Sequence, residues 1–171
     1  RQLVLCTFTE KAAFEMRDRL AAAARKVGYT ADLSELTVST IHGFCSRILT
    51  QHRHRTELGH GFDTLDDLTQ LLFIFEHFEE IIGPAENDRF LLSWKTRWTA
   101  IEGARGYFDK ITEELVDPAG FAGSADPFLV AIGNAYRRYE RTLFDANRIN
   151  FAHLQRLVYD LLGDPATADA V

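Results

Sequence analysis

Two short segments near the start of the chain combine aromatic, hydroxyl, basic and glycine residues. The first, Thr7-Phe8-Thr9-Glu10-Lys11, offers a ring, two hydroxyls and an ammonium group. Such groups bind phosphates, and an exposed phenylalanine stacks on a nucleic-acid base with about 1–3 kcal/mol. In the second, Ser39-Thr40-Ile41-His42-Gly43, the imidazole can donate to a phosphate and the glycine lets a backbone approach closely. The expected contact residues are Thr7, Phe8, Thr9, Lys11, Thr40, His42 and Gly43.

The same residues also have simpler structural roles, and the sequence alone leaves these open. Phe8 can belong to the core, Thr9 can serve only as a helix cap and Lys11 can be a solvated charge. Likewise, Thr40 can cap a helix while His42 is half-exposed. Two such turns side by side at one sheet edge would form a continuous groove, and this pairing favours the binding function.

Each segment is expected to follow a strand and to begin a helix. Residues 2–8 are a short apolar run typical of a strand buried on both faces, and a helical pattern then continues to Gly28. A second strand at 36–40 and a helix from 41 to about 51 follow. Because ligands bind at the carboxyl ends of parallel strands, this order predicts that both segments share one edge.

The rest of the chain is predicted to be helical after a polar loop at 52–61. Expected helices span 65–82, 90–101, 107–115, 127–143 and 151–162, with caps at Asp63 or Thr64, Asp126 and Asn150 and stops at Gly83-Pro84 and Gly163. The acidic pairs are expected to face solvent, and Trp94 and Trp98 to face the core. The predicted fold class is mostly α with a small parallel β portion. Since two strands make no stable sheet alone, we expect a fragment of a larger fold.

Charge is distributed unevenly along the 171 residues. The net charge is −6, but residues 1–55 hold nine Lys and Arg against five Asp and Glu. An anionic ligand should therefore meet the first third of the chain, while the acidic remainder suits solvent or a protein contact. No apolar run approaches eighteen residues, so no membrane span is expected. Cys6 and Cys45 are expected to be buried thiols in a reducing cytoplasm.

Several familiar catalytic patterns are missing from the sequence. It contains no G-x-x-x-x-G-K-[ST] loop, no G-x-G-x-x-G and no nucleophile elbow. The segment His52-Arg53-His54-Arg55, with His60, could in principle bind a metal. No cysteine or carboxylate accompanies it at ligand spacing, so we interpret it as a solvated or phosphate-steering loop and expect no metal site.

Three stretches resemble the UvrD/Rep/PcrA helicases of superfamily 1. Residues 7–19, T-F-T-E-K-A-A-x-E-M-x-x-R, look like motif Ia of that family. Residues 39–49 look like the T-x-H-x-x-x-x-x-L segment that follows it. Residues 136–154 resemble the family's Y-x-x-Y…L-D-F-D-D-L stretch, with Asn-Phe-Ala-His in place of Asp-Phe-Asp-Asp, which puts any role of those acids in doubt.

The resemblance implies a domain arrangement. Residues 1–51 would be part of a RecA-like α/β lobe, 52–130 an inserted helical subdomain, and 131–171 helices that return to the lobe. The family's Walker A loop would precede residue 1 and its Walker B box would follow residue 171. The chain would then hold no cofactor and show no ATPase activity alone, whereas the parent protein would bind ATP and magnesium.

The resemblance also implies a function and partners. The parent would be a helicase that moves 3′ to 5′ in DNA repair, recombination or replication. Its partners would be single-stranded DNA or a single/double-strand junction, and the remaining helicase lobes. Phe8 matches the base-contacting aromatic, while Thr9, Lys11, Thr40 and His42 match positions along the DNA path. Glu10 stands where the family commonly has asparagine; it is left out because a carboxylate cannot donate to phosphate.

Two other functions stay open at this point. One is a self-contained helical interaction module with an acidic docking face and no role in nucleic-acid binding. The other keeps the motor but joins it to a nuclease, as in recombination helicase–nucleases.

Overall fold

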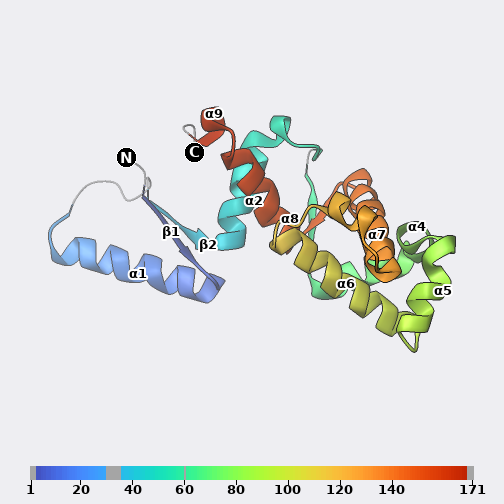
Figure 1. Cartoon of the computed structure of the whole chain (residues 1–171). Coiled ribbons are helices and arrows are strands. Elements are labelled where there is room, and N and C mark those ends of the chain that lie inside the picture. The colour runs from blue at the N-terminus through green and yellow to red at the C-terminus, as the bar shows by residue number, and fades with distance from the viewer. Residues whose placement is uncertain (1–2, 30–35, 60, 169–171) are drawn as a thin grey trace. The chain divides into compact units, whose positions relative to one another are not determined.

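The computed structural model describes residues 3–29, 36–59 and 61–168. The described elements fall into two compact units, one within Arg1–Gln51 and one within His52–Val171 (Figure 1). Both are mostly helical, and in the described residues each holds one two-stranded parallel sheet. The predicted class, mostly α with a small parallel β portion, is confirmed.

The first unit has the predicted order of strand, helix, strand and helix. Its elements are β1 (Leu3–Thr7), α1 (Glu10–Lys26), β2 (Leu36–Thr40) and α2 (Ile41–His52). The two strands run parallel, with Leu3 opposite Leu36 and Thr7 opposite Thr40. Parallel pairing makes both strands end at the same edge, from which α1 and α2 begin.

Local sequence signals set the ends of α1. The Thr9 side chain accepts a hydrogen bond from the backbone N–H of Ala12 at 3.2 Å, which satisfies one of the free donors of the first turn. After Val27, Gly28 adopts φ +69°, a left-handed conformation that glycine takes without strain. The predicted cap and stop are therefore confirmed.

Strand β1 is not buried on both faces, and that prediction is wrong. Leu3 is 59% exposed, and the Cys6 thiol is exposed as well, whereas Cys45 is buried as expected. Within the described residues β1 pairs only with β2, so a sheet of two strands leaves much of its surface to solvent. Gln2, also assigned to this strand, lies outside the described residues.

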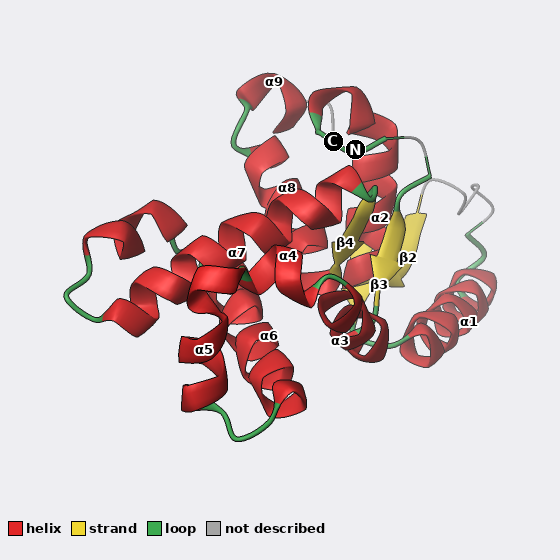
Figure 2. Ribbon diagram, turned by 90° about the vertical axis from the view of Figure 1, so that its right-hand side faces the viewer, coloured by secondary structure: helices red, strands yellow, loops and turns green. Residues whose placement is uncertain are grey.

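The second unit is mostly helical and has a short parallel strand pair to one side of its helices (Figure 2). Its elements are η1 (Arg53–Arg55), β3 (Asp63–Leu65), α3 (Asp67–Glu76), α4 (Phe78–Ile82), α5 (Pro84–Ser93), α6 (Arg97–Glu113), η2 (Pro118–Gly123), α7 (Pro127–Asp145), β4 (Arg148–Asn150), α8 (Phe151–Leu162) and α9 (Pro165–Ala168). The predicted helix starts at Asp126 and Asn150 are confirmed, because each side chain accepts a backbone N–H of the first turn.

The β3–β4 pair was not predicted, and it corrects the expectation of two strands only. Asp63 lies opposite Arg148 and Leu65 opposite Asn150 in a parallel ladder. Each strand has only three residues, too few to show an alternating pattern. The helix that follows β3 is capped by Asp66 rather than by the expected Asp63 or Thr64.

Two predicted helices are interrupted. The pattern over 65–82 breaks at His77, where the backbone (φ −101°, ψ 22°) departs from helical values between α3 and α4. The pattern over 90–101 breaks between α5 and α6, because Trp94 is extended and Thr96 forms a capping box that starts α6. Helix α6 then continues without a break through the predicted separate helix at 107–115.

Aromatic rings dominate the core of the second unit. Phe108 stacks on Tyr139 with ring centroids 4.7 Å apart, and Phe90 lies 5.2 Å from Trp94. Trp94 packs against this core as predicted, but Trp98 is 40% exposed and donates its indole N–H to Glu102.

The acidic pairs Asp66-Asp67, Glu79-Glu80 and Glu113-Glu114 are exposed as expected. Across the described residues, no helix combines the length and apolar character needed to cross a bilayer.

Candidate nucleic-acid interface

The two predicted binding segments meet at one edge of the β1–β2 pair. Thr7 and Thr40 are the last residues of their strands and lie opposite each other in the ladder. The turn at Phe8 and Thr9 therefore starts beside the first residues of α2. The sequence predicted this juxtaposition, and the strand register confirms it.

The first turn is closed by its own hydroxyls. The backbone N–H of Thr9 donates to Oγ1 of Thr7 at 3.2 Å, and that hydroxyl donates to the carbonyl of Thr9 at 3.2 Å. The Phe8 side chain is held outward by this turn and is 89% exposed. An exposed ring in this position is accessible to a base for stacking. Lys11, in the first turn of α1, is exposed as well.

The second turn is tied internally and to the first through one hydroxyl. The backbone N–H of Gly43 donates to Oγ1 of Thr40 at 3.0 Å, and the same hydroxyl donates to Oε1 of Glu10 at 3.1 Å. Thr40 is only 7% exposed, whereas Gly43 is exposed. A Cβ on Gly43 would lie 3.0 Å from Oγ1 of Thr40, so a side chain at this position would press on the bond. His42 is half-buried.

The structure thus separates the predicted residues into two sets. Phe8 and Lys11 present their side chains to solvent, while Thr7, Thr9 and Thr40 form hydrogen bonds within the turns. Glu10 is not among the predicted contact residues, but its carboxylate accepts the Thr40 hydroxyl between the two turns. Its position one residue after the helix cap was the available signal, since acidic residues there interact favourably with a helix N-terminus.

One arginine also links helix to strand in this unit. The guanidinium of Arg17 donates from Nε and Nη2 to the carbonyl of Val38, at 3.1 and 2.9 Å. This pair of bonds fixes the middle of α1 on β2. The cationic side chain of Arg17 is therefore committed to the scaffold, whereas Lys11 at the start of the same helix is exposed.

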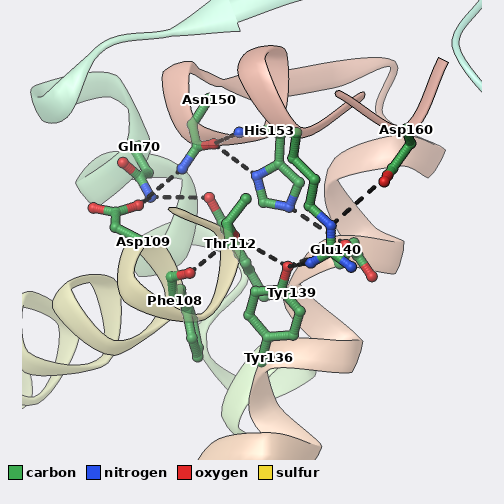
Figure 3. A network of polar contacts seen from close by, with 11 residues as sticks. Gln70, Phe108, Asp109, Thr112, Tyr136, Tyr139, Glu140, Asn150, His153 and Asp160 are labelled. Atoms are coloured by element: carbon green, nitrogen blue, oxygen red, sulfur yellow. Dashed lines mark hydrogen bonds and ion pairs between the residues drawn. The ribbon is translucent and has the colours of Figure 1, made fainter. Parts of the chain in front are cut away.

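A second polar cluster, which sequence analysis missed, is buried in the helical unit (Figure 3). Gln70 donates from Nε2 to Asp109 at 2.8 Å and to the Tyr139 hydroxyl at 3.0 Å. Asn150 donates from Nδ2 to the same Asp109 oxygen at 2.9 Å, and its Oδ1 accepts the backbone N–H of His153 at 2.9 Å. These contacts join α3, α6, α7 and α8.

The other half of the cluster centres on Tyr136. Its hydroxyl donates to Glu140 at 3.1 Å, lies 3.0 Å from the Thr112 hydroxyl and accepts from Arg156 at 3.3 Å. His153, 1% exposed, places Nε2 3.6 Å from Glu140. Tyr136 belongs to the apolar face of its helix, but Thr112, Glu140 and Arg156 are residue types that usually face solvent, so only the tertiary arrangement reveals the cluster.

Burial changes the acid–base behaviour of the cluster. Burial raises the pKa of Asp109, in opposition to the hydrogen bond from Gln70 and the charge of Arg105. Burial likewise raises the pKa of Tyr136 to about 12. For Glu140, burial alone would raise the pKa, but His153, Tyr136 and Arg156 together outweigh it and the pKa is lowered. The tyrosine, histidine and amide groups of the cluster are buried, while Asp109, Glu140 and Arg156 keep about a quarter of their side chains exposed, and together the contacts tie the helices to one another.

In the histidine-rich segment His52–Arg55, the last residue has a structural role. His52 ends α2, and residues 53–55 form the 3₁₀ helix η1. The guanidinium of Arg55 pairs with the Asp164 carboxylate and with the Thr167 hydroxyl. His60 lies outside the described residues. In the part of the chain that is described, no three His, Cys, Asp or Glu side chains gather as metal ligands would.

Known proteins resemble this chain along nearly its whole length. A family model described as the UvrD/REP helicase N-terminal domain matches residues 1–170. A probable DNA helicase II homolog of Mycoplasma capricolum is 29% identical over 162 residues, which cover 94% of this chain and 21% of that protein. The ATP-dependent DNA helicase UvrD1 of Mycobacterium bovis is 29% identical over 165 residues, covering 90% and 18%.

A further relative has a composite name. An ATP-dependent helicase/nuclease subunit from Syntrophomonas wolfei is 36% identical over 104 residues, which cover 53% of this chain and 8% of that protein. The chain therefore spans between 8% and 21% of the length of these three curated relatives. The resemblance noted in the sequence is confirmed: this chain belongs to the UvrD/REP helicase family.

Proposed function

We propose that this chain supplies part of the single-stranded DNA track of an ATP-dependent DNA helicase that moves 3′ to 5′. The observation that carries the proposal is the pairing of Thr7 with Thr40, which brings the two turns to one strand edge beside a Phe8 ring that is 89% exposed. A stacking ring next to two helix N-termini suits a base and its adjoining phosphates.

Each predicted contact residue has a distinct role in this proposal. Phe8 stacks on a base and Lys11 neutralises a phosphate, because both side chains are exposed. Thr7 and Thr9 hold the first turn in shape through their mutual hydrogen bonds. Thr40 supports the second turn, where His42 and Gly43 line the path of the strand.

The proposed function includes a domain arrangement. Residues 1–51 form part of a RecA-like lobe, 52–130 an inserted helical subdomain and 131–171 helices that return to the lobe. ATP and magnesium bind to sequence outside this chain, so the chain alone has no ATPase activity. The complete protein works in the cytoplasm on a single strand or at a single/double-strand junction, together with its other lobes, in repair, recombination or replication.

The test of this function is Phe8→Ala in the complete protein. Loss of one stacked base predicts a single-strand affinity lower by roughly 5- to 150-fold, which corresponds to about 1–3 kcal/mol. Fluorescence anisotropy with a labelled oligothymidine measures it. Phe14→Ala is the matched control, because Phe14 is also an exposed phenylalanine, 62% accessible, but lies on α1 beyond the turn. An affinity unchanged by Phe8→Ala removes the ring from the track.

The direction of movement needs an assay of its own. Strand displacement from substrates with a 3′ or a 5′ single-stranded tail distinguishes the two directions. We expect unwinding only from the 3′ tail, and unwinding from the 5′ tail alone would contradict the proposal.

A second candidate function keeps the same motor and adds a nuclease. It is favoured by the helicase/nuclease relatives from Syntrophomonas wolfei and Ligilactobacillus salivarius, each 36% identical over the matched part. ATP-dependent degradation of linear duplex DNA by the complete protein would support it. Unwinding without any degradation would support a helicase function without a nuclease.

A further inference from the structure

Glu10 lies where the two turns of the candidate DNA interface meet. Its Oε1 atom accepts the Thr40 hydroxyl at 3.1 Å, across 30 positions of sequence. Glu10 starts α1 directly after the Thr9 cap, and Thr40 ends β2 directly before α2. The bond therefore joins the first turn to the second turn at the common edge of the strands.

The proton of the Thr40 hydroxyl explains why this bond matters. A threonine hydroxyl has one proton to donate and two lone pairs to accept with. With its proton directed at Glu10, the hydroxyl accepts the Gly43 N–H at 3.0 Å through a lone pair, so one atom serves both contacts. A carboxylate is a pure acceptor, so the hydroxyl must be the donor in this bond; Thr40 is only 7% exposed, whereas Glu10 is exposed.

We propose that Glu10 is a positioning residue of the DNA track, which acts through Thr40 to hold Gly43 and the second turn against the first. The inference rests on the proposed function. Glu10 touches no DNA in this scheme, and its negative charge, taken alone, repels a phosphate backbone. Glu10 acts by fixing geometry. It holds the turn that carries Phe8 and the turn that carries His42 at a fixed separation, so DNA binding does not require the two turns to become ordered first.

Substitutions at Glu10 separate geometry from charge. Glu10→Gln retains an oxygen acceptor for Thr40 and removes the charge, so single-strand affinity in the complete protein should be equal to or higher than that of the wild type. Glu10→Ala removes both, and affinity should fall roughly three- to tenfold, as expected for one lost hydrogen bond. Glu15→Ala on the exposed side of the same helix removes an equal charge without the bond and should not weaken binding.

Thr40 gives the complementary pair of variants. Thr40→Ser keeps the hydroxyl and should rescue the contact with Glu10, whereas Thr40→Val removes both the bond to Glu10 and the bond from Gly43, so it should lose at least as much affinity as Glu10→Ala. The double variant should be no weaker than Thr40→Val alone, because Thr40→Val already removes the connection to Glu10. Thermal unfolding followed by circular dichroism identifies any variant that fails to fold, and the Gln and Ser variants then decide the outcome.

Two results would overturn the inference. One is a Glu10→Ala variant that binds as tightly as the wild type or more tightly, since charge alone would then account for Glu10. The other is an equal loss in Glu10→Gln and Glu10→Ala, since the acceptor oxygen would then be irrelevant. The Gly43 amide proton shift, measured by NMR, should move in Glu10→Ala and not in Glu15→Ala. This NMR shift tests the bond between Glu10 and Thr40 independently of DNA binding. Normal binding by Phe8→Ala would instead refute the proposed DNA track.

Discussion

Thr7 and Thr40 are partners in the parallel β1–β2 ladder, and each is the last residue of its strand. This one relationship puts two helix starts at the same edge, although α1 and a connecting segment separate them along the chain. A polynucleotide can then contact both turns at once. Binding through several weak contacts at one edge gives an affinity that depends strongly on salt.

We expect Lys11→Gln to reduce the salt dependence of single-strand binding. Lys11 is exposed in the first turn of α1, where a phosphate would lie. Removing one phosphate contact lowers the slope of log affinity against log salt by about 0.7 for a single strand. Anisotropy titrations at several salt concentrations measure it. Lys26→Gln, at the far end of the same helix, is the control, and an equal change in both variants would contradict a local contact.

Gly103→Ala should destabilise the helical unit. An added Cβ would lie 2.4 Å from the Trp94 indole, which packs against the aromatic core. Such overpacking costs about 1–3 kcal/mol of the free energy of unfolding. Gly106→Ala on the same helix meets nothing within 4 Å and should gain up to about 1 kcal/mol from helix propensity. Urea unfolding compares the two, and equal stabilities would show that Trp94 gives way.

Asp109→Asn should change how stability depends on pH. Burial raises the folded-state pKa of Asp109, so the stability it contributes is present below its unfolded pKa of about 3.9 and is lost as pH rises through the folded value. Asparagine does not titrate and keeps an oxygen for Gln70 and Asn150. The variant should therefore gain stability relative to the wild type as pH rises above the unfolded value of about 3.9.

Urea unfolding at pH 4, 5, 6 and 7 measures this difference for Asp109→Asn. Asp88→Asn, at an exposed acid on α5, is the matched control for the loss of one negative charge. A difference between Asp109→Asn and the wild type that shrinks as pH rises would show that Asp109 is stabilised in its charged form.

Tyr136→Phe should alter stability at high pH. Burial raises the pKa of Tyr136 to about 12, above the unfolded value of about 10. As pH rises from about 10 to 12, the free energy of unfolding of the wild type therefore falls by up to about 1.4 kcal/mol per pH unit, because the folded state retains the Tyr136 proton that the unfolded state has lost. Tyr136→Phe has no hydroxyl to titrate, so the difference in free energy of unfolding between the variant and the wild type should become smaller over that range, as measured by denaturant unfolding. A deficit independent of pH would mean that the hydroxyl is solvated.

The sequence predicts the first unit well because its signals are local. A cap at Thr9, a glycine at 28 and two apolar runs determine where α1 begins and ends and where the strands lie. The exposure of β1 could not be predicted, because burial depends on which other strands pair with it. The placement of Phe8 followed from the turn, but the link from Glu10 to Thr40 depends on strand register and side-chain direction.

The second unit was harder to predict because its organisation is tertiary. Gln70, Asp109, Asn150 and His153 sit on different elements, and each is a polar residue of the kind that usually faces water. Strands β3 and β4 pair residues from opposite ends of the unit, and neither is long enough to show a period. Thr96 interrupts an apparent helical pattern because a threonine pair can close a capping box.

The short β3–β4 ladder has a mechanical consequence. The chain enters β3 at Asp63 and leaves β4 at Asn150, so tension along the polypeptide would pull the two parallel strands in opposite directions along their axes. Hydrogen bonds loaded in this way share the force instead of breaking one after another. The helices from α3 to α7 lie between the two strands in the sequence, so they would carry none of this load and would keep their packing.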